Sequence, residues 1–94
     1  MIYEWDEAKR ASNLIKHGLD FDLVRAFNWD TAIIQEDARR DYGERRWVAI
    51  GQMGERVVVV VYTYRDGITR LISARGASNK EILYHETAHH PQHA

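Results

Sequence analysis

Residues 56–75 read RVVVVVYTYRDGITRLISAR, and this stretch decides the fold. The β-branched and aromatic residues from Val57 to Tyr64 favour a strand, and Asp66-Gly67 is a strong signal for a two-residue hairpin turn. Because Val57 to Val61 is apolar on both faces, the strand is expected to be central and covered on both sides. The stretch therefore predicts two antiparallel strands, Arg56–Arg65 and Ile68–Arg75.

A third strand, Arg45–Met53, precedes this hairpin and joins it through a weaker turn signal, Gly54-Glu55. Two-residue turns fix which residues stand opposite each other. One face then carries the rows Trp47–Tyr62–Leu71, Ala49–Val60–Ser73 and Gly51–Val58–Arg75. The other face carries Val48–Val61–Ile72 and Ile50–Val59–Ala74, with Arg46–Thr63–Arg70 at its end. We expect helices to pack on the second, apolar face, and a ligand to approach the first face, which bears aromatic and arginine side chains.

The flanking segments predict helices on both sides of these strands. Asp6 suits the N-cap and Gly18 the C-terminal end of a helix over Glu7–His17, in which Ala8, Ala11 and Ile15 share a face. A shorter helix follows Asp20, with Leu23, Val24 and Phe27 directed inward. The remaining expected elements are a strand at Thr31–Glu36, a polar loop at Asp37–Gly43, and a helix that begins at the capping box Ser78–Glu81. The predicted class is α+β: two N-terminal helices, an antiparallel β-meander and a C-terminal helix.

Composition limits the class of protein. The 94 residues, with 45% hydrophobic and 29% charged side chains, suit one domain over residues 1–88, followed by a frayed, His-rich tail at 89–94. The lack of cysteine excludes disulfide scaffolds and thiolate zinc sites. A formal charge of −1 argues against coating nucleic acid by bulk charge. No signal peptide or membrane segment is visible, so we expect a cytoplasmic protein with no membrane partner.

His85-Glu86-Thr87-Ala88-His89 matches HExxH, the zincin signature. A zincin helix lies inside a cleft and needs a third ligand, whereas here only His90 and His93 follow, in a segment with little apolar material. We interpret the motif as a His-rich helix end, and we expect neither a metal site nor a cofactor.

Several basic residues have both a functional and a structural interpretation. Lys16 and His17 end the first helix, where they either complement the helix dipole or transfer protons. Arg75, beside Ser73, either holds a phosphate or pairs with a carboxylate such as Glu81 or Asp41. The sequence between Gly67 and Lys80 has no acidic residue, which favours an anion site. Trp47 and Tyr62 suit either the core or a base-stacking platform.

Several segments, in matching order from Tyr3 to about Tyr84, resemble the BrnT toxins. At the N-terminal end they are Tyr3-Glu4-Trp5-Asp6, Lys9, Asn13, Lys16-His17-Gly18 and Phe21. Further along they are Glu36-Asp37, Arg39, Asp41-Tyr42-Gly43-Glu44-Arg45-Arg46, the Val-rich strand ending at Tyr62-Thr63, and Arg70-Leu71-Ile72-Ser73-Ala74-Arg75. The family usually has more basic residues after the last motif, where this chain has Gly76 and Asn79, and this weakens the local phosphate-binding field.

The resemblance implies a RelE-like fold, a ribonuclease activity that stops translation, and a BrnA-like antitoxin encoded alongside. It implies operator DNA as a partner only through that antitoxin, and a homodimer within the complex is a further expectation.

RNA cleavage without metal needs a base, a cation for the phosphate and an acid. The candidates for proton transfer or positioning are Lys16, His17 and Tyr62, and those for charge stabilisation are Arg46, Arg70 and Arg75. Ser73 completes the candidate catalytic set, and the candidate RNA contacts are Arg39, Trp47 and Lys80. A non-catalytic binding module, such as an inactive toxin relic, is the alternative from another class, and a zincin is the third.

Overall fold

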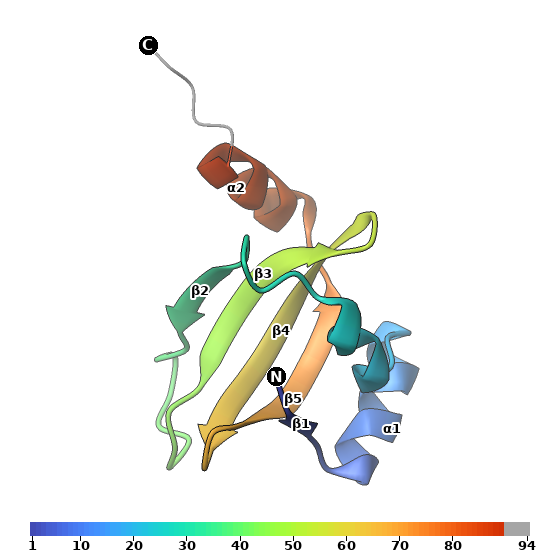
Figure 1. Cartoon of the computed structure of the whole chain (residues 1–94), viewed down its shortest axis with the longest axis vertical. Helices are drawn as coiled ribbons and strands as arrows, with labels where there is room; N and C mark the ends of the chain where they lie inside the picture. The colour runs from blue at the N-terminus through green and yellow to red at the C-terminus, as the bar shows by residue number, and fades with distance from the viewer. Residues whose placement is uncertain (90–94) are drawn as a thin grey trace.

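The computed structural model describes residues 1–89, which form a five-stranded mixed sheet with helices beside it and at one end (Figure 1). The strand order is β1-β5-β4-β3-β2, and only β1 runs parallel to its neighbour. The elements in chain order are β1 (Tyr3–Glu4), α1 (Glu7–His17), the 3₁₀ helix η1 (Phe21–Ala26), β2 (Ile33–Glu36), β3 (Trp47–Met53), β4 (Arg56–Arg65), β5 (Ile68–Gly76) and α2 (Asn79–His89). The part of the expected tail at 90–94 lies outside the described residues.

The α+β class is confirmed, but the order of elements differs from the prediction in two places. The chain begins with a strand, β1, whose two residues pair with Thr69 and Arg70 of β5. Two residues are too few to show a strand periodicity, so this strand had no sequence signal. The second helix is a six-residue 3₁₀ helix, in which Val24 is buried but Leu23 is 52% exposed. Such tight turns are typical of short connecting pieces.

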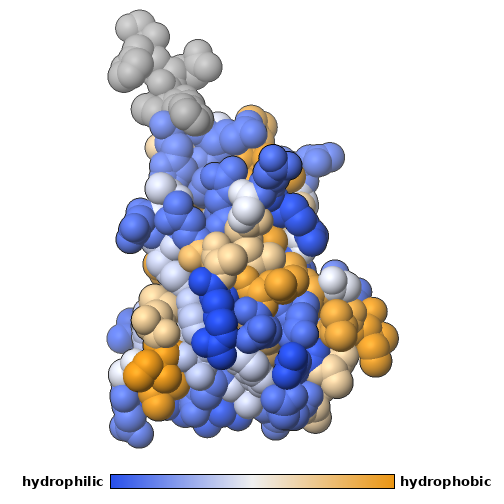
Figure 2. Space-filling model, turned by 45° about the vertical axis from the view of Figure 1, so that its right-hand side comes forward, coloured by the Kyte–Doolittle hydropathy of each residue, from blue (hydrophilic) through white to orange (hydrophobic). Residues whose placement is uncertain are grey.

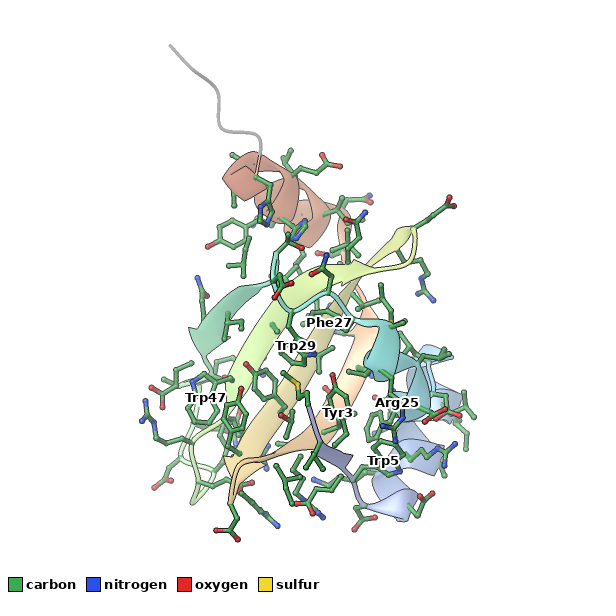
Figure 3. The ribbon with its side chains drawn as sticks, in the orientation of Figure 1. Tyr3, Trp5, Arg25, Phe27, Trp29 and Trp47 are labelled. Carbon is green, nitrogen blue, oxygen red and sulfur yellow. The ribbon has the colours of Figure 1, made fainter. Side chains whose placement is uncertain are left out.

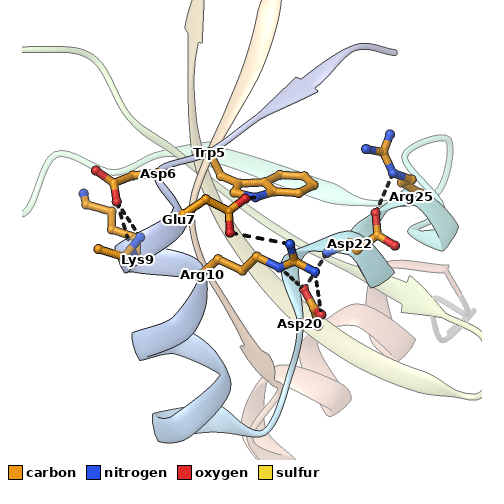
Figure 4. A network of polar contacts seen from close by, with 9 residues as sticks. Trp5, Asp6, Glu7, Lys9, Arg10, Asp20, Asp22 and Arg25 are labelled. Atoms are coloured by element: carbon orange, nitrogen blue, oxygen red, sulfur yellow. Dashed lines mark hydrogen bonds and ion pairs between the residues drawn. The ribbon is translucent and has the colours of Figure 1, made fainter.

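Helix α1 has the predicted bounds because both ends are capped. The Asp6 carboxylate accepts hydrogen bonds from the backbone N–H groups of Ala8 and Lys9, and Gly18 adopts a left-handed conformation with φ 67°. The Arg10 guanidinium donates two hydrogen bonds, of 2.7 and 3.0 Å, to Asp20, which joins α1 to the start of η1 (Figure 4). The face shared by Ala8, Ala11 and Ile15 is exposed, and the buried residue of α1 is Asn13.

The 3₁₀ helix η1 and the segments beside it pack on the aromatic face of the sheet, so the predicted assignment of the two faces is wrong. Tyr62, Leu71 and Val60 form one core with Phe21 and Phe27. Trp29 joins this layer, since its ring lies 5.0 Å from that of Tyr62 and its indole N–H donates to the Tyr3 hydroxyl (Figure 3). Large aromatic side chains bury more apolar area than valine does, and this favours them as the covered face.

The predicted register between β3 and β4 is confirmed from Trp47↔Tyr62 to Gly51↔Val58. The register between β4 and β5 is confirmed at Tyr62↔Leu71 and is wrong beyond it, because the next pair is Val61↔Ser73. Ile72 is therefore the extra residue of a β-bulge. A bulge shifts the alternation of side chains by one, so Ala74 points into the core, and Ser73 and Arg75 share the opposite face with Val61 and Val59.

Hydrophilic side chains dominate the face shown in Figure 2, with smaller hydrophobic areas between them. The exposed large apolar residues include Leu14 and Ile15 of α1, and Leu23 of η1. In the described part of the chain, neither α-helix combines the length and apolar character that crossing a bilayer requires.

Candidate functional site

A groove runs along the sheet face that the N-terminal helices leave uncovered, and we call it the sheet groove. Its floor is apolar, from β3 and β4, and its walls are polar. The walls come from the end of α1, from β2 and the loop after it, from β5 beyond the bulge, and from the first turn of α2. The residues that line it are His17, Gln35, Glu36, Asp37, Ala38, Arg39, Val48, Ile50, Val59, Val61, Ser73, Arg75 and Glu81.

Arg75 is the cation on the β5 side of the groove, and it is paired. Its Nη1 and Nη2 atoms donate to the two carboxylate oxygens of Glu81, at 2.7 and 2.8 Å, and Nη1 also lies 3.4 Å from the Gly76 carbonyl oxygen. These hydrogen bonds lower the pKa of Glu81 to about 2 and raise that of Arg75. An arginine has five N–H donors, so two of them have no partner among the described residues. The guanidinium can therefore remain paired with Glu81 and still bind an anion.

Arg39 is the cation on the opposite wall and is also paired. Its Nε and Nη2 atoms donate to the Asp37 carboxylate at 2.8 and 2.9 Å, and the Tyr42 hydroxyl donates to the same group at 3.2 Å. The Asp37 side chain is only 2% exposed, whereas that of Arg39 is 77% exposed. The hydrogen bonds from Arg39 outweigh the cost of burial and lower the pKa of Asp37 to about 2. In the loop after β2, the buried Asp37 carboxylate thus holds the exposed Arg39 side chain in position.

The two depressed pKa values predict how stability depends on pH. In the unfolded chain both carboxylates take up protons near pH 4, whereas in the folded chain they stay ionised down to about pH 2. The unfolded state therefore binds more protons in this window, and stability falls as pH is lowered from about 5 to 2. Urea unfolding at pH 7, 5, 4 and 3 measures this, and Asp37→Asn should lose less stability over the same range. An equal loss in both proteins would assign the effect to other groups.

His17 and Ser73 lie where α1 meets β5. Both line the sheet groove, and both also line a neighbouring hollow that contains Lys16 and Asn13. His17 is the exposed last residue of α1. Gly18 follows it in a left-handed conformation and ends the helix. The structure therefore brings together Ser73, Arg75, His17 and Arg39 around one groove, with Lys16 beside it.

A comparison with protein-family models matches residues 5–81 to the family described as ribonuclease toxin, BrnT, of type II toxin-antitoxin systems. The chain belongs to the BrnT family. A comparison with curated proteins finds no match. The resemblance expected from the sequence is thereby confirmed, and BrnT toxins, as members of type II systems, imply an antitoxin partner.

The other residues expected at the BrnT site lie elsewhere. The side chain of Arg70 pairs with Glu4 at 3.4 Å. Arg46 pairs with Glu44 at 3.6 Å, and its guanidinium carbon lies 4.1 Å from the centre of the Tyr42 ring. The expected site residues that line neither the sheet groove nor the neighbouring hollow are Arg46, Trp47, Tyr62, Arg70 and Lys80. Tyr62 is 1% exposed on the core face, with Trp47 packed against it.

The HExxH motif holds α2 in place. The Nε2 atoms of His85 and His89 lie 3.2 and 2.5 Å from the Thr31 carbonyl oxygen, and the Tyr84 hydroxyl accepts a hydrogen bond from Gln35 of β2. Among residues 1–89, no three histidine, aspartate or glutamate side chains gather as a metal ion would require. The motif therefore supports packing between α2 and the segment around β2.

Replacing Glu86 by glutamine is accordingly expected to leave RNA cleavage unchanged. Glu86 is exposed, whereas the base of a zincin acts inside a cleft on a metal-bound water. RNA cleavage by Glu86→Gln and by the unaltered protein, each with and without EDTA, tests this. An activity lost in EDTA and restored by zinc would contradict it.

Sequence reasoning misses one groove feature and gives a second only as one of two alternatives. The sequence places Asp37 in a solvated polar loop, but its side chain is the buried anchor of Arg39. The Asp37-Ala38-Arg39 spacing allows a local side-chain pair, yet nothing in it indicates burial. Glu81 is predicted as a capping residue, and it does accept from the Ser78 N–H at 2.8 Å. The sequence indicates its second contact, with Arg75, only as an alternative to phosphate binding.

Proposed function

We propose that this BrnT-family chain is a metal-independent endoribonuclease that binds single-stranded RNA in the sheet groove and inhibits translation in the cytoplasm. The placement of Arg75 supports this most directly. Its guanidinium lies on a wall of the groove, and two of its N–H groups have no acceptor among the described residues. Arginine is well suited to phosphate because its donors form a rigid planar fork. A BrnA-like antitoxin, alone or around a toxin homodimer, neutralises the toxin, and operator DNA is bound only through the antitoxin. The fold proposed for this activity is RelE-like.

The proposed reaction uses the 2′-hydroxyl of RNA as the nucleophile. That oxygen attacks the adjacent phosphorus, a base takes its proton, and the bond to the 5′-oxygen breaks as that oxygen gains a proton. His17 is the candidate for proton transfer, since imidazole exchanges protons near neutral pH, and Lys16 lies beside it. Arg75 stabilises the charge on the phosphate, and Ser73 lines the groove together with His17 and Arg75. Arg39 contacts the RNA from the opposite wall.

The direct test uses the purified protein on single-stranded RNA in EDTA, together with growth of cells that express it. We expect cleavage in EDTA, arrested growth, and recovery of growth when the protein encoded by the adjacent reading frame is co-expressed. The same two measurements on His17→Ala test the role of His17, and this variant should lose both cleavage and toxicity. Intact RNA after incubation with folded protein would contradict the proposal.

A non-catalytic binding module is the second candidate, because both groove cations are paired with carboxylates and Gly76 replaces a basic residue of the family pattern. Gly76→Lys distinguishes the two. A Cβ at Gly76 would lie 2.8 Å from the terminal nitrogen Nη2 of Arg56, and that flexible side chain can move aside. Faster RNA cleavage by Gly76→Lys would identify a weakened nuclease, whereas antitoxin binding without cleavage in either protein would favour the binding module.

A further inference from the structure

Asn13 is the one buried polar residue of α1, and the proposed reaction does not use it. Its side chain is hydrogen bonded throughout. Nδ2 donates to the carbonyl oxygens of Leu19 and Ala74, both at 2.8 Å, and Oδ1 accepts from the Ala74 N–H at 3.0 Å. The carboxamide therefore forms hydrogen bonds with both the N–H and the carbonyl group of one β5 residue, Ala74. Its exposure is 5%, so water does not compete for these bonds.

The contact lies on the edge of β5 that faces away from β4. Strand β1 pairs with this edge only at Thr69 and Arg70. Farther along, at Ala74, the Asn13 carboxamide makes the two hydrogen bonds that the peptide group of a neighbouring strand would make. Ala74 is also the first core residue after the bulge, and the two residues that flank it, Ser73 and Arg75, line the sheet groove.

We propose that Asn13 is a positioning residue that holds β5 in its bulged register and so directs Ser73 and Arg75 into the groove. Regular pairing of β4 with β5 would place both side chains on the core face, because a shift of one residue exchanges the two faces of a strand. Asn13 selects the shifted register by binding Ala74 where that residue points inward. This proposal rests on the proposed ribonuclease function, since it names what positions the groups of that site.

The same residue links two parts of the groove wall, the end of α1 and β5. His17 follows Asn13 by four residues, so the two lie on the same side of α1, one turn apart. Since Asn13 binds β5 directly, the position of His17 relative to Arg75 depends on this contact. The loss of the carboxamide should therefore disturb the geometry of the reaction more than the binding of RNA.

The experiment compares Asn13→Ala with Leu14→Ala, a neighbouring change at a side chain that is 47% exposed. We expect Asn13→Ala to lower kcat about 100-fold, the loss that a misplacement of about 1 Å can cause. KM should change by less than about threefold, because the cations that bind RNA remain present. The backbone N–H of Ala74 should exchange with solvent faster in Asn13→Ala than in the unaltered protein. Leu14→Ala should change none of these three quantities.

Asn13→Asp is the second variant, and it keeps the inference testable if Asn13→Ala does not fold. The carboxylate retains the acceptor for the Ala74 N–H but has no donor for the carbonyl oxygens of Leu19 and Ala74. Protonation restores one donor. Its cleavage rate, divided by that of the unaltered protein at the same pH, should therefore rise as the pH is lowered. A flat ratio would overturn the proposal.

The two proposals can fail separately. If the unaltered protein does not cleave RNA, the proposed function is wrong, and the exchange of the Ala74 N–H still decides whether Asn13 holds the register. If the unaltered protein cleaves RNA and Asn13→Ala cleaves it equally fast, Asn13 is not a positioning residue. Unchanged Ala74 exchange in a folded Asn13→Ala protein would equally exclude that role.

Discussion

Replacing Arg75 by alanine is expected to slow RNA cleavage about 30- to 1,000-fold, which corresponds to roughly 2–4 kcal/mol of lost transition-state stabilisation. The guanidinium lies on the wall of the sheet groove beside Ser73, and the hydrogen bonds to Glu81 hold it in a fixed orientation. A charged donor that is already oriented stabilises the developing charge on the phosphate without reorganising. Cleavage rate and melting temperature, measured on the same preparation, test this expectation.

Glu81→Gln is the matched control, because it removes the partner of Arg75 and keeps the guanidinium. The side chain of Arg75 is 40% exposed, and a partly exposed pair contributes less than about 1 kcal/mol to stability. Glu81→Gln keeps the guanidinium and one acceptor oxygen for it, so it should lose less cleavage activity than Arg75→Ala, and both variants should melt near the unaltered protein. A folded Arg75→Ala protein that cleaves RNA at the original rate would contradict the role of Arg75. If Arg75→Ala fails to fold, the pair with Glu81 is structural, and the reactive groups would have to be sought along Lys16, His17 and Arg46.

The strands were predictable because turn chemistry is local. Asp66 and Gly67 both adopt positive φ, at 54° and 78°, and Gly54 does so at 63°. These are the conformations that a tight hairpin needs and that Gly and Asp tolerate. Two such turns fix the order and, in the first hairpin, the full register of the strands. The pairing of β1 with β5 was not predictable, because it joins two residues at the N-terminus to a strand far along the chain.

The face of the sheet that binds helices depends on distant partners. Seen alone, the valine-rich face is the more apolar one. In the folded chain, Phe21, Phe27 and Trp29 surround Tyr62 on the other face, and Gly51 leaves room for the Phe27 ring. A Cβ at Gly51 would lie only 2.6 Å from Phe27 Cζ. This close approach gives the glycine a role that a strand pattern alone cannot indicate.

Ser73 and Arg75 are predicted on the ligand face, and they line the groove for a different reason. Regular pairing puts them on the face with Tyr62, which the sequence predicts to be the open one. The bulge at Ile72 moves both residues to the opposite side, and η1 with the segments beside it covers the Tyr62 side. The wrong register and the wrong choice of the covered face cancel for Ser73 and Arg75. For Tyr62 and Trp47 only the wrong choice of the covered face applies. The bulge itself depends on contacts between β5 and other elements, such as that with Asn13, rather than on local sequence.

Tyr62→Ala is expected to destabilise the protein by about 3–5 kcal/mol, the usual cost of truncating a large aromatic side chain in a core. Tyr62 is 1% exposed, and its ring lies 5.0 Å from that of Trp29 and 5.5 Å from that of Tyr64. Burial also raises the pKa of its phenol well above the usual value, so the hydroxyl stays protonated at neutral pH. A side chain held neutral in the core cannot serve as the base at a groove on the other face of the sheet. Urea unfolding of Tyr62→Ala measures the loss.

Tyr62→Phe separates packing from chemistry, because it keeps the ring and removes only the hydroxyl. It should lose no more than about 1–2 kcal/mol of stability, the scale of one hydrogen bond. Its RNA cleavage rate should match that of the unaltered protein under conditions where both are fully folded. A folded Tyr62→Phe protein with greatly reduced cleavage would show that the hydroxyl reaches the reacting atoms. The RNA would then have to enter the aromatic layer between β3, β4 and Trp29, which requires η1 to move away from the sheet.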